Sequence, residues 1–270
     1  MTGPFVSRVG GVLSADIAVP EYERAMRFYA RVLSTGKQPL WRTDLLNNQG
    51  VPIIGLGQRD AAHANLPIQW MPHIQVANIA ESVTRALALG GSELMHGRDA
   101  DGQSQWAVLC DPNGAAFGLI PAVDAEVLPT TGDDALAQVG YIAWLDLTVT
   151  NASATRDFYR QVVGWSVQDV EMDDGGAFYV DYNMIGGDGH PVAGICHARG
   201  VNRDLPSTWM MYLPVNNLNE STRRVREEGG AVIKTIHGAD GELTHAIVED
   251  PVGAYLALVA GGYSVERPLA

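Results

Sequence analysis

The chain has 270 residues, 46% of them hydrophobic and 18% charged, with a formal net charge of -13 at pH 7. This length and apolar content suffice for one large core or two modest ones. The acidic balance disfavours nucleic acids and anionic membranes as partners, because each carries the same sign of charge as the protein.

Hydrophobic periodicity predicts an ordered series of elements over residues 1–122. Alternating polarity indicates strands, and an apolar stripe with a 3.6-residue period indicates helices. Gly90–Gly91 provide the left-handed stop that a helix needs. In chain order, we expect a strand over Gly11–Val19, a helix around Phe28–Tyr29, a strand over Pro52–Leu56, a strand over Met71–Val76, a helix over Ile79–Leu89, and a hairpin of Gln105–Leu109 with Ala116–Ile120.

The same order of elements is predicted again for residues 139–262. The first helix of this stretch has an apolar face of Ala154, Phe158, Val162 and Val163. In chain order, we expect a strand over Tyr141–Val149, this helix, strands over Ala177–Tyr182 and Pro191–Cys196, a strand over Met210–Val215, a helix over Leu218–Glu228, and a hairpin of His245–Val248 with Tyr255–Val259. The polar stretch 123–138 is predicted as a linker, and 263–270 as a tail.

Short motifs recur between the two stretches and indicate a duplicated module. Phe28–Tyr29 returns as Phe158–Tyr159, and the turn Asp111–Ala115 returns as Asp250–Ala254. Gly90–Gly91 likewise returns as Gly229–Gly230. The offset grows from 130 to 139 positions between the first and second pairs, so the second copy carries about nine additional residues. A period above 100 residues is that of a domain and exceeds that of solenoid units.

Cysteine usage and hydropathy narrow the setting of the protein. Cys110 and Cys196 occupy unmatched positions in the two copies, so we expect free thiols. No segment approaches the roughly 20 apolar residues that span a membrane, and Met1 to Gly11 lack the basic and apolar runs of a secretory signal. These features predict a cytoplasmic protein with no nucleic-acid or membrane partner, and we expect a monomer or homodimer.

In this order, the repeated motifs resemble those of the vicinal oxygen chelate superfamily, which includes glyoxalase I, bleomycin-resistance proteins, fosfomycin-resistance enzymes and extradiol dioxygenases. The opening of the second copy, Trp144–Leu147 followed by Phe158–Tyr159 and Gly164–Trp165, is most similar to two-module actinobacterial members labelled glyoxalase or hydroxylase. The resemblance implies an α+β fold of two tandem βαβββ-type modules, 1–122 and 139–262, that form a shared cleft.

Metal-dependent members of this superfamily hold Zn, Ni, Fe or Mn, which polarises vicinal oxygens of the substrate. The resemblance also implies where the ligands would lie, and those positions are occupied here by Ser14, Met71 and Gly118 in the first module and by Trp144, Met210 and Ala257 in the second. Only Ser14 offers an oxygen, and a neutral hydroxyl is a weak ligand. We therefore expect no metal ion and no other cofactor.

Alternation along strands places a residue two positions beyond each lost ligand on the same face of the sheet. Asp16 and His73 are thereby candidate catalytic residues, acting as an acid–base pair. The candidate ligand-binding residues are Ser14, Met71, Trp144, Asp146, Met210 and Tyr212. The alternative interpretation makes both aspartates structural and His73 a core histidine. Trp144 is favoured as a ring against a planar ligand, whereas Trp70 and Trp209 are favoured as packing residues.

Two hypotheses about function follow. In the first, which the sequence slightly favours, the protein binds a mostly apolar or aromatic metabolite or antibiotic without a metal, as bleomycin-resistance proteins sequester their drugs. In the second, it is an isomerase, lyase or hydrolase that uses Asp16 and His73. A metal-dependent glyoxalase or dioxygenase is the least supported reading, because oxygen chemistry without an organic cofactor needs the metal whose ligands are missing.

Overall fold

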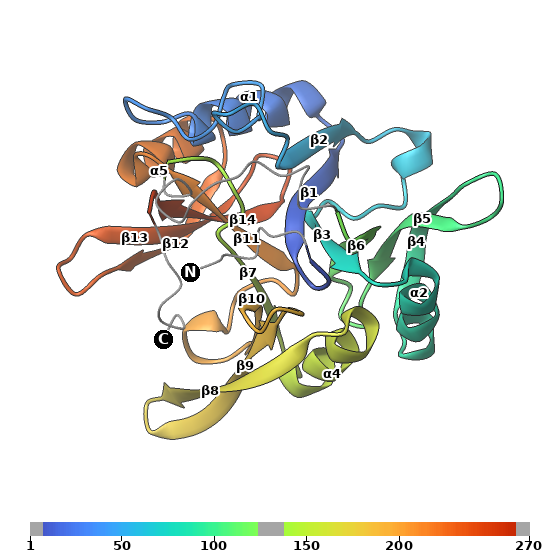
Figure 1. The fold of residues 1–270 in the computed structure, drawn as a ribbon. Coiled ribbons are helices and arrows are strands. Elements are labelled where there is room, and N and C mark those ends of the chain that lie inside the picture. Colours follow the sequence, from blue (N-terminus) through green and yellow to red (C-terminus); the bar gives the residue numbers. More distant parts are fainter. Residues whose placement is uncertain (1–7, 124–137, 263–270) are drawn as a thin grey trace.

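The computed structural model describes residues 8–123 and 138–262, and it shows one sheet for each predicted module (Figure 1). The predicted linker 123–138, apart from its end residues, and the predicted tail 263–270 lie outside the described residues. The strands of the two sheets lie within residues 12–121 and 144–260. Among the described residues, no helix has the length and apolarity needed to cross a bilayer.

The N-terminal module forms a 6-stranded sheet in the order β2-β1-β3-β6-β5-β4. Its helices α1 and α2 each follow a central strand, β1 and β3. The elements are β1 (Val12–Val19), α1 (Tyr22–Leu33), β2 (Ile54–Gln58), the 3-10 turn η1 (Ala61–His63), β3 (Met71–Val76), α2 (Ile79–Ala88), β4 (Ser92–Arg98), β5 (Ser104–Cys110) and β6 (Ala116–Pro121).

The C-terminal module repeats this strand order and adds two strands at one edge, giving an 8-stranded sheet in the order β12-β13-β14-β11-β7-β10-β9-β8. The added strands β8 and β9 form a long antiparallel hairpin. The elements are β7 (Trp144–Val149), α4 (Ala152–Val163), β8 (Ser166–Asp174), β9 (Ala177–Ile185), β10 (Pro191–His197), η3 (Gly200–Asn202), β11 (Trp209–Val215), α5 (Leu218–Glu227), β12 (Ala231–His237), β13 (Leu243–Glu249) and β14 (Tyr255–Ala260).

The predicted elements are present, and three strands were missed. These are β4, β8 and β12, all at sheet edges, whose mostly exposed or half-exposed residues lack the apolar run that marks a buried strand. The predicted apolar face of α1 is fully buried, whereas in α4 the prediction for Ala154 was wrong because this residue is exposed. Thr155 and Tyr159 are buried there, so the face is rotated toward them.

The two modules pack through their helices, with α1 beside α5 and α2 beside α4 (Figure 1). The repeated motifs meet at this interface. Tyr29 of α1 donates its hydroxyl proton to Asp250 Oδ2 at 2.7 Å, and Trp70 Nε1 donates to the Tyr29 hydroxyl at 3.0 Å. Each of these groups is contributed by a repeated motif, and Asp250 belongs to the opposite module.

The same arrangement recurs with the modules exchanged. The Tyr159 hydroxyl lies 3.4 Å from Asp111 Oδ2, and Trp209 Nε1 donates to the Tyr159 hydroxyl at 3.0 Å. Trp70 and Trp209 are buried and therefore have the packing role favoured from the sequence. The Phe-Tyr and Asp-Pro-x-Gly motifs thus brace one module against the other.

The second glycine of each Gly-Gly pair makes room for the same interface. A Cβ on Gly91 would lie 3.2 Å from Phe158, and a Cβ on Gly230 would lie 2.7 Å from Phe28. One hydrophobic cluster runs through both modules, from Val12 to Leu258. The two copies therefore share a core.

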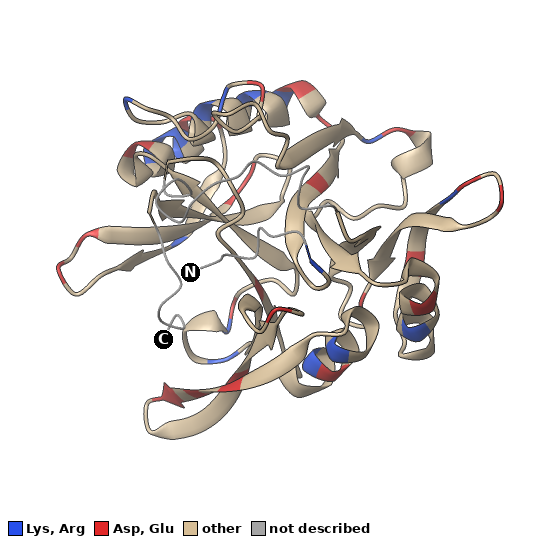
Figure 2. Ribbon diagram, in the orientation of Figure 1, with Lys and Arg blue, Asp and Glu red and all other residues tan. Residues whose placement is uncertain are grey.

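Basic residues gather on the helices, whereas acidic residues are spread more widely. Figure 2 shows Lys and Arg on the helices, and Asp and Glu on helices, strands and hairpin tips. Arg223 pairs with Glu227 and Arg224 with Glu220 along α5, while Arg27 and Arg31 of α1 reach Glu228 beyond the end of α5. The basic residues are thus matched by acidic neighbours.

Two candidate ligand clefts

Each module has its own cleft, and both clefts lie on the sheet face that the helices leave free. The C-terminal cleft has a volume of about 370 Å³, and the described residues that line it all lie between Trp144 and Ile247. The N-terminal cleft has a volume of about 600 Å³, and its described lining residues all lie between Asp16 and Ile120. The prediction of a cleft shared between modules was therefore wrong for these two sites. The helical faces that join the modules point away from both.

Strand β7 shows how the sequence divides between core and cleft. Trp144, Asp146 and Thr148 face the C-terminal cleft, whereas Leu145 and Leu147 lie in the core. This is the two-residue alternation of a strand. The neighbouring strand β11 places Tyr212 opposite Trp144 and Met210 opposite Asp146.

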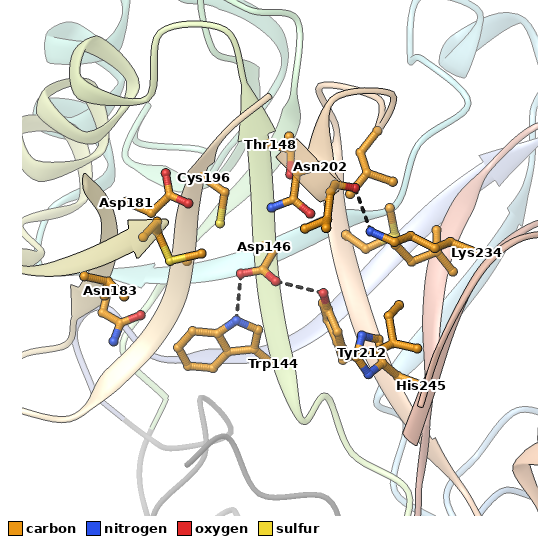
Figure 3. Close-up of a pocket in the computed structure, with 18 of the residues that line it drawn as sticks. Trp144, Asp146, Thr148, Asp181, Asn183, Cys196, Asn202, Tyr212, Lys234 and His245 are labelled. Carbon is orange, nitrogen blue, oxygen red and sulfur yellow. Dashed lines mark hydrogen bonds between the residues drawn. The ribbon is translucent and has the colours of Figure 1, made fainter. Parts of the chain in front are cut away.

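The centre of the C-terminal cleft is a hydrogen-bonded trio (Figure 3). Trp144 Nε1 donates to Asp146 Oδ1 at 2.8 Å, and the Tyr212 hydroxyl donates to Asp146 Oδ2 at 2.8 Å. Burial raises the pKa of Asp146 above its ordinary value, although the two donors oppose this shift. Because both oxygens already accept a hydrogen bond, Asp146 fixes the two aromatic side chains in place.

The far wall of this cleft comes from the β8–β9 hairpin and from β10. Asp181 Oδ1 accepts a hydrogen bond from the His197 backbone N–H at 2.8 Å and lies 2.9 Å from His197 Nδ1. Asp181 Oδ2 is buried with no hydrogen-bond partner. Burial raises the pKa of Asp181 and that of the Cys196 thiol, which also lines the cleft.

The opposite wall carries basic side chains. Lys234 Nζ donates to the Val201 carbonyl oxygen at 2.6 Å. Burial, assisted by the positive charge of Lys234, lowers the pKa of His245 to about 4. His245 is therefore neutral near pH 7. In Figure 3, Asp181 and Lys234 lie on opposite sides of Asp146.

The N-terminal cleft contains the predicted acid–base pair. His73 Nε2 lies 3.6 Å from Asp16 Oδ2, and His73 Nδ1 lies 2.9 Å from the Ser14 hydroxyl oxygen. Burial lowers the pKa of His73, while the Asp16 carboxylate opposes this shift. The Asp16 side chain is 57% exposed. A neutral imidazole beside an exposed carboxylate can accept or relay a proton.

The structure divides the predicted site residues between the clefts. Asp16, Met71 and His73 line the N-terminal cleft, and Trp144, Asp146, Met210 and Tyr212 line the C-terminal one. Their predicted grouping into one cleft was wrong. Ser14 lines neither cleft and contacts this region through His73.

The sequence analysis did not identify most residues on the two sides of the C-terminal cleft. These residues include Thr148, Met172, Asp181, Asn183, Cys196, Asn202, Lys234 and His237. The alternation of Tyr179, Asp181 and Asn183 was the available signal. It could not be used without knowing that β9 joins the same sheet as Trp144.

The positions that the resemblance assigns to metal ligands do not fit a divalent metal ion. The strand register also corrects the second position of each set, because it aligns His73 and Tyr212, and not Met71 and Met210, with the other four residues. Register places Ser14, His73 and Gly118 side by side on β1, β3 and β6, so one imidazole stands beside a hydroxyl and a glycine. The His73 ring fills the space at Gly118, where a Cβ would lie 2.7 Å from it. The equivalent row in the other module is Trp144, Tyr212 and Ala257. Among the described residues, no group of three His, Cys, Asp or Glu side chains could hold a metal.

Comparison with known families agrees with this architecture. The glyoxalase-like domain family matches residues 14–120, and the glyoxalase/bleomycin resistance protein/dioxygenase superfamily matches residues 141–268. The chain belongs to the vicinal oxygen chelate superfamily. The resemblance inferred from its motifs is thereby confirmed, as is the duplicated glyoxalase-like fold.

Solved structures with the same fold include a synthase and a dioxygenase. 4-Hydroxymandelate synthase from Streptomyces coelicolor matches the present chain with a TM-score of 0.54 and 10% identity. The match covers 97% of the present chain and 95% of the synthase chain. A catechol 2,3-dioxygenase matches with a TM-score of 0.53 and 13% identity, over 97% and 96% of the two chains. At these identities the likeness shows the fold alone.

Curated relatives match over one part of the chain. The anthracycline biosynthesis protein DauV of Streptomyces sp. (strain C5) is 30% identical to the present chain over 131 residues, which cover 44% of the present chain and 46% of DauV. The protein CFP32 of Mycobacterium tuberculosis (strain CDC 1551 / Oshkosh), which carries a provisional glyoxylase name, is 28% identical over 116 residues, 43% of each chain. The matches thus span less than half of each relative.

Proposed function

We propose that this protein binds an apolar or aromatic small molecule, a metabolite or an antibiotic, in the C-terminal cleft without the help of a metal ion. The observation that carries the proposal is the trio of Trp144, Asp146 and Tyr212. The trio holds two aromatic side chains by hydrogen bonds to one carboxylate, and one of them, Trp144, stands at a position that the resemblance assigns to a metal ligand. The proposal includes a cytoplasmic location and a monomeric or homodimeric state, with no nucleic-acid or membrane partner.

The lining of the C-terminal cleft as a whole suits an apolar or aromatic ligand. Apolar and aromatic side chains dominate its surface: Trp144, Val170, Met172, Tyr182, Met210, Tyr212 and Ile247. A volume of about 370 Å³ lies in the range of about 300–1,000 Å³ that is usual for small-molecule sites. The name of DauV, an anthracycline biosynthesis protein, supports polycyclic aromatic compounds as a class to test.

The test is calorimetric titration with a neutral anthracycline aglycone and with the smaller indole alcohol tryptophol. We expect the Trp144→Ala variant to lose more than tenfold in affinity, because truncating an aromatic anchor removes both contact area and shape. Trp106→Ala, which alters the wall of the N-terminal cleft, should leave this affinity unchanged. Chelator treatment should also have no effect, and no stoichiometric metal should be found by elemental analysis.

The results that contradict the proposal are equally specific. Loss of binding in Trp106→Ala with retention in Trp144→Ala would place the ligand in the N-terminal cleft. Loss of binding after removal of a metal ion would contradict metal independence.

A second function is favoured by one observation, the 3.6 Å approach of His73 Nε2 to Asp16 Oδ2 in the N-terminal cleft. This pair supports acid–base chemistry of the isomerase, lyase or hydrolase type, with the neutral His73 as base. An enzyme of this kind should return an altered compound after many turnovers, and its pH–rate profile should change in His73→Gln and in Asp16→Asn. A product yield that is unaffected by both variants would exclude the pair.

A further inference from the structure

Asp181 carries a buried oxygen that has no hydrogen-bond partner among residues 8–123 and 138–262. Only 3% of this residue is exposed, and it lines the C-terminal cleft from strand β9. Its Oδ1 is used by His197, whereas Oδ2 has no hydrogen bond. A buried carboxylate oxygen that lacks a donor is costly, so such an atom in a cleft indicates where a donor from a ligand would bind.

The neighbouring groups make this end of the cleft negative. The negative charge of Asp181 contributes to the raised pKa of Asp146 and of Cys196, so Asp181 interacts electrostatically with both groups. Asp146 offers no free donor, since it accepts from Trp144 and Tyr212. None of the described residues that line the cleft donates to Asp181 Oδ2.

The cations near the cleft are engaged elsewhere. Lys234 donates to the Val201 carbonyl and lies across the cleft from Asp181 (Figure 3). Arg199 lies 4.2 Å over the Tyr179 ring and 3.6 Å from Asp174. His197 uses Nδ1 toward Oδ1. Because Asp181 lines the cleft, a cation that enters the cleft from solution can approach this unpaired oxygen.

We propose that Asp181 Oδ2 binds a cationic nitrogen of the ligand, whose aromatic part lies against Trp144 and Tyr212. The ligand class is thus an aromatic amine in its protonated form. This inference rests on the proposed function and adds a charge requirement to it. A protonated amine is favoured over a hydroxyl because it supplies both a donor and a charge opposite to that of the two carboxylates.

The experiment compares three probes that share one ring and differ only in the end group. Tryptamine carries an ammonium group, tryptophol a hydroxyl and indole-3-propionate a carboxylate. In calorimetric titration of the full chain near pH 7, we expect tryptamine to bind at least tenfold more tightly than tryptophol, and indole-3-propionate to bind most weakly. The isosteric Asp181→Asn variant should lose the preference for tryptamine over tryptophol.

Glu171→Gln is the matched control. Glu171 lies on the adjacent strand β8 and is exposed, and its neighbours Val170 and Met172 line the cleft, so its own side chain points away from it. The substitution removes the same formal charge from the same hairpin. The tryptamine preference should persist in this variant.

Equal affinity of the wild-type protein for tryptamine and tryptophol would overturn the inference, and this comparison needs no variant to fold. Retention of the preference in a folded Asp181→Asn protein would also overturn it. Binding of both probes with dependence on Trp144 but no preference would leave the proposed function standing while the charge requirement fails. Absence of binding by either probe and by the neutral aglycone would overturn both.

Discussion

Asp16 and Asp146 occupy equivalent positions on β1 and β7, yet the two residues have different surroundings. Asp146 accepts hydrogen bonds from two aromatic donors, and Asp16 is mostly exposed beside His73. A glycine on the neighbouring strand makes room for each carboxylate, since a Cβ on Gly55 or Gly194 would lie 2.2 Å from it. The carboxylate position is shared by the modules, and its chemistry is set by the residues around it.

His245 makes a prediction about acid stability. Its pKa in the folded protein is about 4, whereas the pKa of an ordinary histidine is 6.5. Between these two pH values, His245 is protonated in the unfolded chain and neutral in the folded chain. Stability from this residue is therefore present above pH 6.5 and declines as the pH falls toward 4. We expect the melting temperature of His245→Gln to fall less than that of the wild type between pH 7 and pH 4.5.

The exposed His237 supplies the control, since His237→Gln should keep the pH dependence of the wild type. Parallel pH profiles of the wild type and His245→Gln would show that His245 titrates normally in the folded protein.

At the scale of elements, the alternation and helical periodicity of the sequence predicted the central strands and the helices α1, α2, α4 and α5. Strand β3 begins and ends where it was predicted, and β1 within one residue. The edge strands β4, β8 and β12 were missed because their exposure depends on the sheet that they join. The β8–β9 hairpin, which holds the second wall of the C-terminal cleft, accounts for the additional length of the second copy but could not be placed by length alone.

Gly230 tests the close packing at the end of α5. A Cβ at this position would lie 2.6 Å from the Glu249 carbonyl oxygen and 2.7 Å from the Phe28 ring. Backbone and a buried ring yield little, so we expect Gly230→Ala to lower the free energy of unfolding by about 1–3 kcal/mol. Urea denaturation measures this change.

Gly57→Ala is the comparison for Gly230→Ala, because its nearest neighbour would be 3.9 Å away and its φ is not positive. Its stability should be close to that of the wild type. An equal loss in both variants would attribute the effect to the loss of glycine itself and not to packing.

At the scale of the molecule, two equivalent contacts between a tyrosine of one module and an aspartate of the other join the modules into one unit. The Tyr29 to Asp250 hydrogen bond measures 2.7 Å and the Tyr159 to Asp111 contact 3.4 Å. We expect Tyr29→Phe to cost about 1–3 kcal/mol of unfolding free energy, because it leaves a buried carboxylate and the Trp70 N–H short of a partner. Tyr159→Phe should cost less, since its contact with the aspartate is longer. The reverse order in denaturation experiments would contradict this assignment.

The shared core makes a prediction about cooperativity. Because one hydrophobic cluster runs through both modules, heating should produce a single calorimetric transition whose van't Hoff and calorimetric enthalpies agree. Two resolved transitions would show that the modules unfold independently and that the helix interface contributes little.

The sequence could reveal the fold because the motifs that repeat are those of the interface. It could not reveal the grouping of the site, since Asp16 and Trp144 have equivalent positions in a duplicated pattern and only the packing of the modules shows that they face separate clefts. The roles predicted for the site residues stay predictions until ligands are tested.

The cross-braces also bear on how duplicated proteins diverge. A substitution in Tyr29 or Asp250 disturbs both halves at once, whereas a substitution in either cleft disturbs only one. Selection that acts on the module interface would therefore preserve the motifs by which such chains are recognised. It would leave the residues that line each cleft free to change. Two proteins can then share every recognisable motif and still accept unrelated molecules.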